Sequence, residues 1–202
     1  MVGSKEIRTK ALSQLKGHWT EPVVFTLLYM LILIAISALS GRNDEHAGLS
    51  TVIQLLVMGP VTYGVTKYFL SFKREEAVDN SMLLAGFKKF TKTFTLYLLM
   101  SIKTFLWTLL FIIPGIIAIY RYSMAYFLMI DHPELSANEL LAKSSQLMDG
   151  YKWKLFVLQL SFIGWQILAI FTFGIGFLWL QPYMAVSQAH FYDMLKEEHK
   201  KV

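Results

Sequence analysis

Apolar residues dominate six stretches of the chain, separated by short polar segments. The stretches cover residues 23–39, 49–72, 93–113, 115–130, 155–173 and 176–192. A membrane-spanning helix needs about 20 mostly apolar residues, because each residue adds about 1.5 Å and the hydrocarbon core is about 30 Å thick. The pattern therefore predicts an all-α transmembrane bundle of six spans, arranged as three hairpins within a single integral membrane domain over residues 1–202.

The third and fourth stretches are separated by Pro114 and Gly115. Proline removes a backbone donor and clashes with the preceding turn, and glycine permits a chain reversal. We therefore expect a full reversal at this dipeptide. A single kinked helix through Pro114 is the alternative, since membrane helices tolerate proline. The fifth and sixth stretches divide at the Gly-Ile-Gly sequence of residues 174–176.

Residues 136–148 lie in the polar loop after the fourth stretch and carry the signature of a helix start. Ser136 and Glu139 have the spacing of a capping box, and Gly150 follows the last expected helical residue. The less polar side of this helix consists of Leu140, Leu141, Ser144, Leu147 and Met148. That side would either dock a protein partner or pack as a connector on the chain's own bundle, and we favour the connector.

Residues 1–22 form a basic segment before the first stretch. Within it Ile7, Ala11, Leu12 and Leu15 fall on one helical face among Lys and Arg residues, which is typical of a cytoplasmic amphipathic helix on an anionic membrane surface. A cleavable signal is the alternative, because small residues occur at 38–41. The basic region is long for a signal peptide, however, and favours a retained anchor.

Composition and charge support the membrane interpretation. Hydrophobic residues make up 55% of the chain and charged residues only 16%, whereas soluble domains carry about a quarter charged residues. The net charge of +5 is scattered among apolar segments, so we expect no nucleic-acid partner. Basic residues concentrate in the N-terminal segment, the 73–92 and 131–154 loops and the C-terminal tail. The positive-inside rule then places both termini in the cytoplasm and leaves only Arg42 among the outer loop cations.

Several motifs together resemble a known family. The run "IPGIIAIYRYSMAYFLMIDHPELSANELLAKSSQLMDGYKWKLF", followed by "GIGFLWLQPY" and preceded by the "ALSQLKGHW" opening, is similar to the bacterial integral membrane family catalogued as domain of unknown function 975. The resemblance implies a multi-pass protein of the bacterial cytoplasmic membrane with no established activity. A looser similarity links the chain to the membrane portion of some glycerophosphodiester phosphodiesterases. Because no catalytic domain is attached, that activity does not carry over.

The sequence carries no familiar catalytic or metal-binding motif. The sequence has no HExxH, no Gly-rich phosphate loop and no convincing Ser-His-Asp set, and it has no cysteine. His190 has no second ligand nearby in sequence and is expected to be a packing or interfacial residue. We therefore expect a non-enzymatic protein without metal or other cofactor. The apolar stretches also lack the internal carboxylates that proton-driven transporters commonly use.

Lys103 and Arg121 lie inside apolar stretches that offer no acidic partner. A cation at the centre of a membrane helix costs about 2.5–3.5 kcal/mol on insertion scales. Snorkelling to the lipid phosphate region is one interpretation. The other is a pocket for an anionic ligand, because arginine presents a fork of donors to phosphate oxygens.

Other polar and aromatic residues fall at a similar expected depth, about 8–16 Å below the outer boundary. We predict that they line one intramembrane pocket with the two cations. The predicted pocket consists of Gln54, Lys103, Arg121, Tyr122, Trp165, Gln166, Gln181 and Tyr183.

Two functions remain open from the sequence. The first is a protein that binds, and helps to move, an anionic amphiphile such as a phospholipid or lipid-linked phosphate in this outer-half pocket. The second is a structural or regulatory membrane subunit that holds a partner through cytoplasmic-face helices such as 136–148. Membrane lipids are the expected partners in the first case and another protein in the second.

Overall fold

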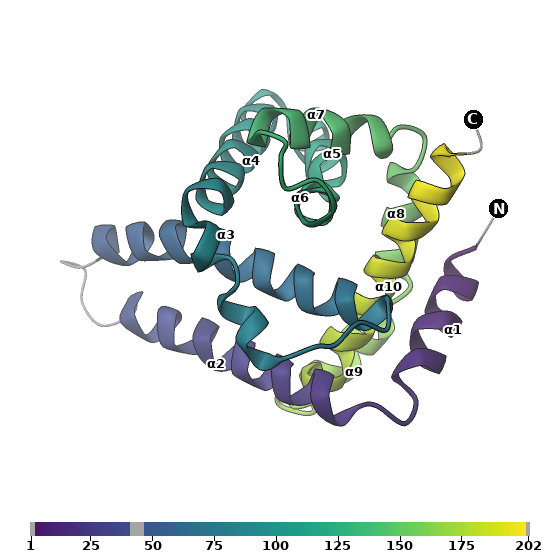
Figure 1. Ribbon diagram of the computed structural model, residues 1–202. Coiled ribbons are helices and arrows are strands. Elements are labelled where there is room, and N and C mark those ends of the chain that lie inside the picture. The colour runs from purple at the N-terminus through teal and green to yellow at the C-terminus, as the bar shows by residue number, and fades with distance from the viewer. Residues whose placement is uncertain (1–2, 41–46, 201–202) are drawn as a thin grey trace.

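The computed structural model describes residues 3–40 and 47–200 and contains helices but no strand in these ranges (Figure 1). Three helical hairpins follow one another, formed by α2 with α3, α4 with α5, and α9 with α10. The α-helices are α1 (Ser4–Leu15), α2 (Thr20–Ser40), α3 (Ala47–Lys73), α4 (Phe90–Leu110), α5 (Ile112–Tyr122), α6 (Ala125–Asp131), α7 (Ala137–Leu147), α8 (Lys152–Leu160), α9 (Ile163–Phe171) and α10 (Phe177–His199). Two short 3₁₀ helices, η2 (Asn80–Leu84) and η3 (Phe87–Lys89), connect α3 to α4.

Four helical stretches of the described chain are long and apolar enough to cross a membrane. They are Thr20–Ala38, Asn80–Leu110, Ile112–Asp131 and Lys152–Phe171. The all-helical, membrane-type character predicted from the sequence is therefore confirmed. Helices α3 and α10 occupy the second and sixth apolar stretches and are not among these four.

The fourth and fifth apolar stretches are each divided into two helices. The fourth forms α5 and α6, which are separated at Ser123, and the fifth forms α8 and α9, which are separated at Ser161. Both serine hydroxyls donate to the carbonyl three residues earlier, Ser123 to Tyr120 at 2.8 Å and Ser161 to Leu158 at 2.6 Å. Serine hydroxyls that bond nearby carbonyls compete with the regular helical pattern. The hydropathy pattern missed these two breaks.

The chain reverses fully between α4 and α5, so the kinked-helix alternative is wrong. The extended residue is Phe111, with φ −160° and ψ 151°, three residues before Pro114. Proline instead occupies the first turn of α5, where its missing N–H leaves no helical bond unmade. Gly115 lets the two helices close, because a Cβ there would lie 2.9 Å from the Cα of Thr108.

The third hairpin closes in the same way. A Cβ on Gly176 would lie 2.9 Å from the Cα of Ala169. In both hairpins the glycine abuts a residue seven positions earlier in the chain. The two hairpins therefore share a close approach of their helices at a glycine.

Helix α7 has the predicted capping box. The Glu139 amide donates to the Ser136 hydroxyl at 3.4 Å, and the Ser136 amide donates to the Glu139 carboxylate at 2.7 Å. The predicted apolar stripe of this helix is buried against α4, α5 and α6. The connector interpretation is thus the one that the structure bears out.

The core lies where α6, α7 and α10 meet. Helix α6 runs between α7 and α3 (Figure 1), and five of its residues are buried. The Phe127 ring stacks on Tyr192 of α10 at a centroid distance of 5.0 Å. Helix α1 covers the outside of α10 and α8 with Ile7, Ala11 and Leu15. Leu12, predicted on the same face, is largely exposed.

A charge cluster joins the ends of the three hairpins. Arg74, just after α3, donates to both carboxylate oxygens of Asp131, at 2.7 and 3.0 Å, and to Asp193 of α10 at 2.9 Å. Lys73 pairs with Asp193 at 2.6 Å, and Lys196 pairs with Asp131. Burial would raise the pKa of Asp193, but hydrogen bonds from Arg74 and Lys73 hold this pKa below its usual value. The ends of α3 and α6 therefore lie at the level of Asp193, within the last part of α10.

Candidate functional site

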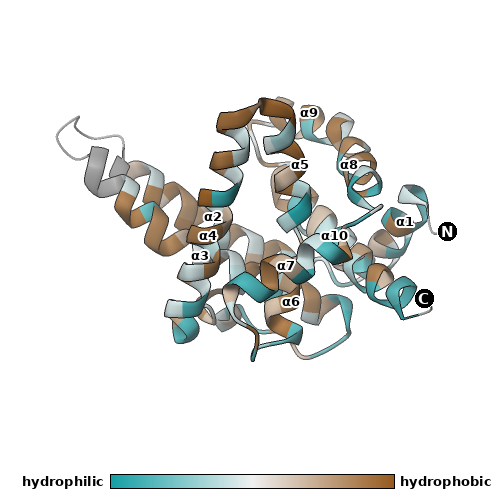
Figure 2. Cartoon of the chain, turned by 90° about the horizontal axis from the view of Figure 1, so that it is seen from above, coloured by the Kyte–Doolittle hydropathy of each residue, from teal (hydrophilic) through white to brown (hydrophobic). Residues whose placement is uncertain are grey.

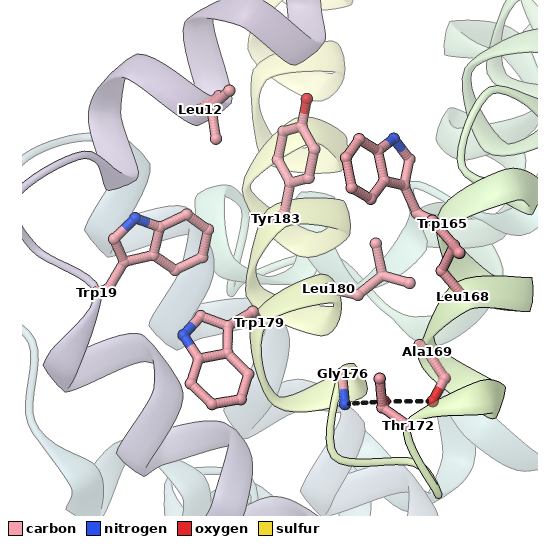
Figure 3. Close-up of a pocket in the computed structure, with 10 residues that line it drawn as sticks. All are labelled: Leu12, Trp19, Trp165, Leu168, Ala169, Thr172, Gly176, Trp179, Leu180 and Tyr183. Carbon is pink, nitrogen blue, oxygen red and sulfur yellow. Dashed lines mark hydrogen bonds between the residues drawn. The ribbon is translucent and has the colours of Figure 1, made fainter.

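An apolar cleft opens between the N-terminal helix and the third hairpin. It has a volume of about 370 Å³ and is bordered by α1, the α1–α2 connection, α9 and α10 (Figure 3). Its lining residues are Leu12, Trp19, Trp165, Leu168, Ala169, Thr172, Gly176, Trp179, Leu180 and Tyr183. The size is within the range of about 300–1,000 Å³ that is usual for small-molecule sites.

One part of the cleft lining comes from the turn of the third hairpin, at Thr172 and Gly176. The Gly176 amide donates to the Thr172 hydroxyl at 2.8 Å, and this hydroxyl donates to the Ala169 carbonyl at 2.7 Å (Figure 3). These bonds satisfy the polar groups of the turn internally. This part of the cleft can therefore face an apolar ligand without leaving these groups unbonded.

Three tryptophans line the cleft. Trp19 faces the cleft from the α1–α2 connection, Trp165 from α9 and Trp179 from α10 (Figure 3). Both Trp165 and Trp179 are exposed. Exposed tryptophans on apolar surfaces are typical of the membrane interface, where the ring contacts hydrocarbon and the N–H contacts water or headgroups. The lining of the cleft thus has the chemistry of a lipid-facing surface.

Arg8 of α1 supplies positive charge beside the cleft. Its Nη1 donates to the Ser161 carbonyl at 2.8 Å, and its guanidinium carbon lies 5.7 Å from the centre of the Phe162 ring. Phe162 in turn contacts the Tyr183 ring edge-on at 5.0 Å. The Arg8 Nε is buried and has no acceptor among the described residues. A donor of this charged group is therefore left without a partner next to an apolar cavity.

The eight residues predicted to share one pocket lie in several places. Trp165 and Tyr183 line the cleft. Gln181 lines a second cavity of about 370 Å³ between α3, α4, α6 and α10. Gln166 donates to the Met184 sulfur at 3.6 Å. Tyr122 is buried in the core, and Gln54 lies on the exposed side of α3.

Lys103 and Arg121 have different neighbours in the second hairpin. The Lys103 ammonium donates to the Asn138 side-chain oxygen of α7 at 3.2 Å. The Arg121 guanidinium carbon lies 5.7 Å from the centre of the Trp107 ring, and its buried Nε has no acceptor among the described residues. The backbone carbonyl of Arg121 accepts a bond from Ser144 of α7 at 2.9 Å. An anion shared by the two cations remains a prediction.

The part of the cleft that comes from the N-terminal segment was not predicted from the sequence. Leu12 and Trp19 line it and Arg8 lies beside it, over the Phe162 ring, yet all three come more than 140 residues before α9. Their spacing carried a partial signal, because Arg8 and Leu12 are four residues apart and share a helical face. His190, expected to be a packing residue, hydrogen-bonds the Gln14 side chain at 2.9 Å. No group of three or more potential metal ligands occurs in residues 3–40 and 47–200.

Comparison with known proteins identifies the family. The sequence profile described as "Protein of unknown function (DUF975)" matches residues 1–120 and 109–199. The chain belongs to the DUF975 family. This membership confirms the resemblance seen in the sequence motifs. No curated protein and no solved structure matches the chain, and the looser similarity to glycerophosphodiester phosphodiesterases is not shown. Because the DUF975 description includes no activity, function has to be argued from the geometry.

Proposed function

We propose that this DUF975 protein binds an anionic amphiphile, such as a phospholipid, without converting it chemically. An acyl chain would occupy the cleft between α1 and α9–α10, and the phosphate would lie near Arg8. The observation that carries the proposal is a buried arginine nitrogen without an acceptor beside an apolar cavity of about 370 Å³. The acyl chain of such a ligand would contact the apolar lining, and its phosphate would contact the arginine.

The charge of α1 supports an anionic rather than a neutral headgroup. Lys5 and Lys10 are exposed on the same helix as Arg8, and Lys16 is exposed directly after its last residue. Basic residues near a membrane surface attract anionic lipids by about 1 kcal/mol each. Arginine adds a directed, bidentate contact to phosphate oxygens. We propose this cleft as the site in place of the predicted outer-half pocket, because the eight residues predicted for that pocket lie in several places. Only Trp165 and Tyr183 of them line the cleft.

The proposed location is the bacterial cytoplasmic membrane, with both termini in the cytoplasm. The positive-inside distribution favours this orientation. The charge cluster of Arg74, Asp131 and Asp193 supports it too, because it brings the ends of α3 and α6 to the same side as the last part of α10. The tips of α4–α5 and α9–α10 then point away from the cytoplasm. No feature of the described residues supports a transport step, so we propose binding alone.

The test compares one arginine variant in α1 with one lysine variant directly after this helix. Arg8→Gln removes a charge-assisted contact worth about 1.5–3 kcal/mol, so bound phosphatidylglycerol should fall roughly tenfold or more. Lys16→Gln makes the same charge change on an exposed side chain and should retain most of the lipid. Native mass spectrometry of the detergent-solubilised protein measures both, at equal amounts of folded protein. Equal lipid retention by the two variants contradicts the proposal.

A control with other ligands separates the sources of the anion. Phosphatidylcholine tests the need for net negative charge, and inorganic phosphate tests whether the headgroup alone suffices. We expect phosphatidylglycerol to displace a fluorescent acyl probe from the cleft and inorganic phosphate to leave it bound. Displacement by phosphate alone would indicate a free-anion site instead of a lipid site.

The partner-holding function is less well supported. The apolar stripe of α7 that would have held a partner is buried in the chain's own core. The outward side of α7 presents Asn138, Glu139 and Gln146. Buried stripes of this kind stabilise the fold and are not free to dock another protein. Copurification of a second chain that depends on Gln146 would be needed to restore this alternative.

A further inference from the structure

The tips of the second and third hairpins are apolar and project from the protein. No charged residue occurs in residues 104–120 or 162–182. Phe111 at the tip of α4–α5 is 71% exposed, and Phe173 at the tip of α9–α10 is 99% exposed. Apolar patches of this extent mark surfaces that contact a membrane or another protein.

Polar contacts surround the base of both tips. We use the name polar belt for Arg8, Lys103, Tyr120, Asn138, Gln159 and Ser161. Lys103 bonds Asn138 at 3.2 Å, the Tyr120 hydroxyl donates to Gln159 at 2.9 Å, and Arg8 donates to the Ser161 carbonyl at 2.8 Å. The Tyr120–Gln159 bond connects the second hairpin to the helix that leads into the third. The belt is therefore common to both tips.

The helices at the polar belt cannot lie in hydrocarbon. On α7, Asn138 and Glu139 are exposed, and on α1 Lys5 and Lys10 are exposed. Charged and amide side chains on an exposed helix face need water or lipid headgroups. Figure 2 shows the same separation, with apolar colour toward α5 and α9 at the upper edge and polar colour over much of α1 and the C-terminal end. The polar belt thus marks the membrane surface.

The length beyond the belt fits half a bilayer. Seven residues of α4 follow Lys103, and nine residues of α9 follow the Ser161–Phe162 break. At about 1.5 Å per residue these segments reach about 10 and 14 Å. Half of the hydrocarbon core is about 15 Å. A hairpin of this depth ends near the bilayer midplane.

We propose that the α4–α5 and α9–α10 tips enter only the cytoplasmic leaflet and do not cross the membrane. The partner of this apolar surface is the acyl-chain region of that single leaflet. The inference goes beyond the proposed lipid site and does not depend on a lipid in the cleft. It replaces four of the six predicted crossings by two hairpins that return within one leaflet.

This placement explains two features that would otherwise cost free energy. Lys103 and Arg121 lie at the level of headgroup phosphates instead of in the middle of the membrane, so neither needs an internal acid. Phe173 has φ +53° and is almost fully exposed, a conformation that is rare for a bulky residue. In hydrocarbon, this strained aromatic side chain contacts acyl chains instead of water.

Single-cysteine variants test the depth directly, because the chain has no cysteine of its own. Phe111→Cys and Phe173→Cys place a thiol at each tip, and Gln146→Cys on the exposed side of α7 is the matched control. A membrane-impermeant maleimide is applied to intact cells and to inverted vesicles. We expect the control to label only in inverted vesicles and both tip thiols to resist labelling on either side until detergent is added.

A nitroxide attached to the same thiols gives a second measurement. At the midplane, collisions with oxygen should exceed those with a polar nickel chelate by a wide margin. Labelling of either tip thiol from outside the intact cell overturns the proposal in favour of a crossing hairpin. Labelling of the tips in inverted vesicles without detergent overturns it as well, because the tips would then be in water. Should a tip variant fail to fold, Ile112→Cys and Ile175→Cys offer exposed neighbours.

Discussion

Replacing Arg74 by methionine removes the cation that joins the three hairpins. The Arg74 guanidinium forms hydrogen bonds with both Asp131 and Asp193. Methionine keeps much of the side-chain length but carries no charge. The two carboxylates would then remain close together in a partly buried site, with only the flanking lysines and Tyr192 to offset their charge.

The expected loss can be worked from the burial of the three groups. The side chains of Arg74, Asp131 and Asp193 are 24%, 11% and 15% exposed. Breaking a buried ion pair from one side costs about 3–5 kcal/mol. Lys196, Lys73 and Tyr192 still bond the acids, so we take the lower end, about 3 kcal/mol. For a chain of this size, this corresponds to a fall in Tm of roughly 6–12 °C.

Thermal unfolding in detergent measures this effect through the fluorescence of the five tryptophans. Lys10→Met is the matched control, because Lys10 forms an exposed ion pair with Glu6 at 2.9 Å and such pairs contribute about 0–1 kcal/mol. Arg74→Lys should fall between the two, since a single ammonium cannot bond both acids as a fork does. If Arg74→Met lowers Tm no more than Lys10→Met does, the charge cluster does not hold the hairpins together.

Two further predictions concern α7 and acid stability. Ser136→Ala should remove a cap worth about 1 kcal/mol and raise hydrogen exchange over residues 137–147, while Ser145→Ala should not; unchanged exchange in both would contradict the capping interpretation. Because the Asp193 pKa is lowered from 3.8, its contribution to stability is present above the unfolded pKa and lost as the pH falls through the folded pKa. Tm should therefore drop in acid below about pH 4, and Asp193→Asn should flatten this dependence, whereas a parallel drop in wild type and variant would assign it to other groups.

Most of the helical fold could be predicted from the sequence, because the signals for helices are local. Apolar stretches predicted the positions of α2, α3, α4 and α10 to within a few residues at most ends, and the Ser136–Glu139 spacing predicted α7. The breaks at Ser123 and Ser161 were missed, since a single serine hydroxyl hardly alters a hydropathy pattern. The turn was placed at Pro114, yet proline fits the first helical turn and Phe111 supplies the extended residue.

The candidate site was harder to predict, because the residues that form it are far apart in sequence. Trp165 and Tyr183 were found through their expected depth, but Arg8 and Trp19 lie in a segment expected to rest on the lipid surface. Depth along a helix says nothing about which way a side chain faces. The partners of Arg74 were missed for the same reason, since Asp131 and Asp193 follow it by 57 and 119 residues.

The long sequence separation within the charge cluster has a consequence for the order of biosynthesis. Arg74 is made first, and 119 residues separate it from Asp193. At about 5–20 residues per second, it waits on the order of ten seconds for its second acid. During this interval Lys73 and Arg74 are two adjacent cations at the end of the first hairpin, where they favour retention on the cytoplasmic side. The same side chains thus first act as a signal that orients the nascent chain and later become a bond that closes it.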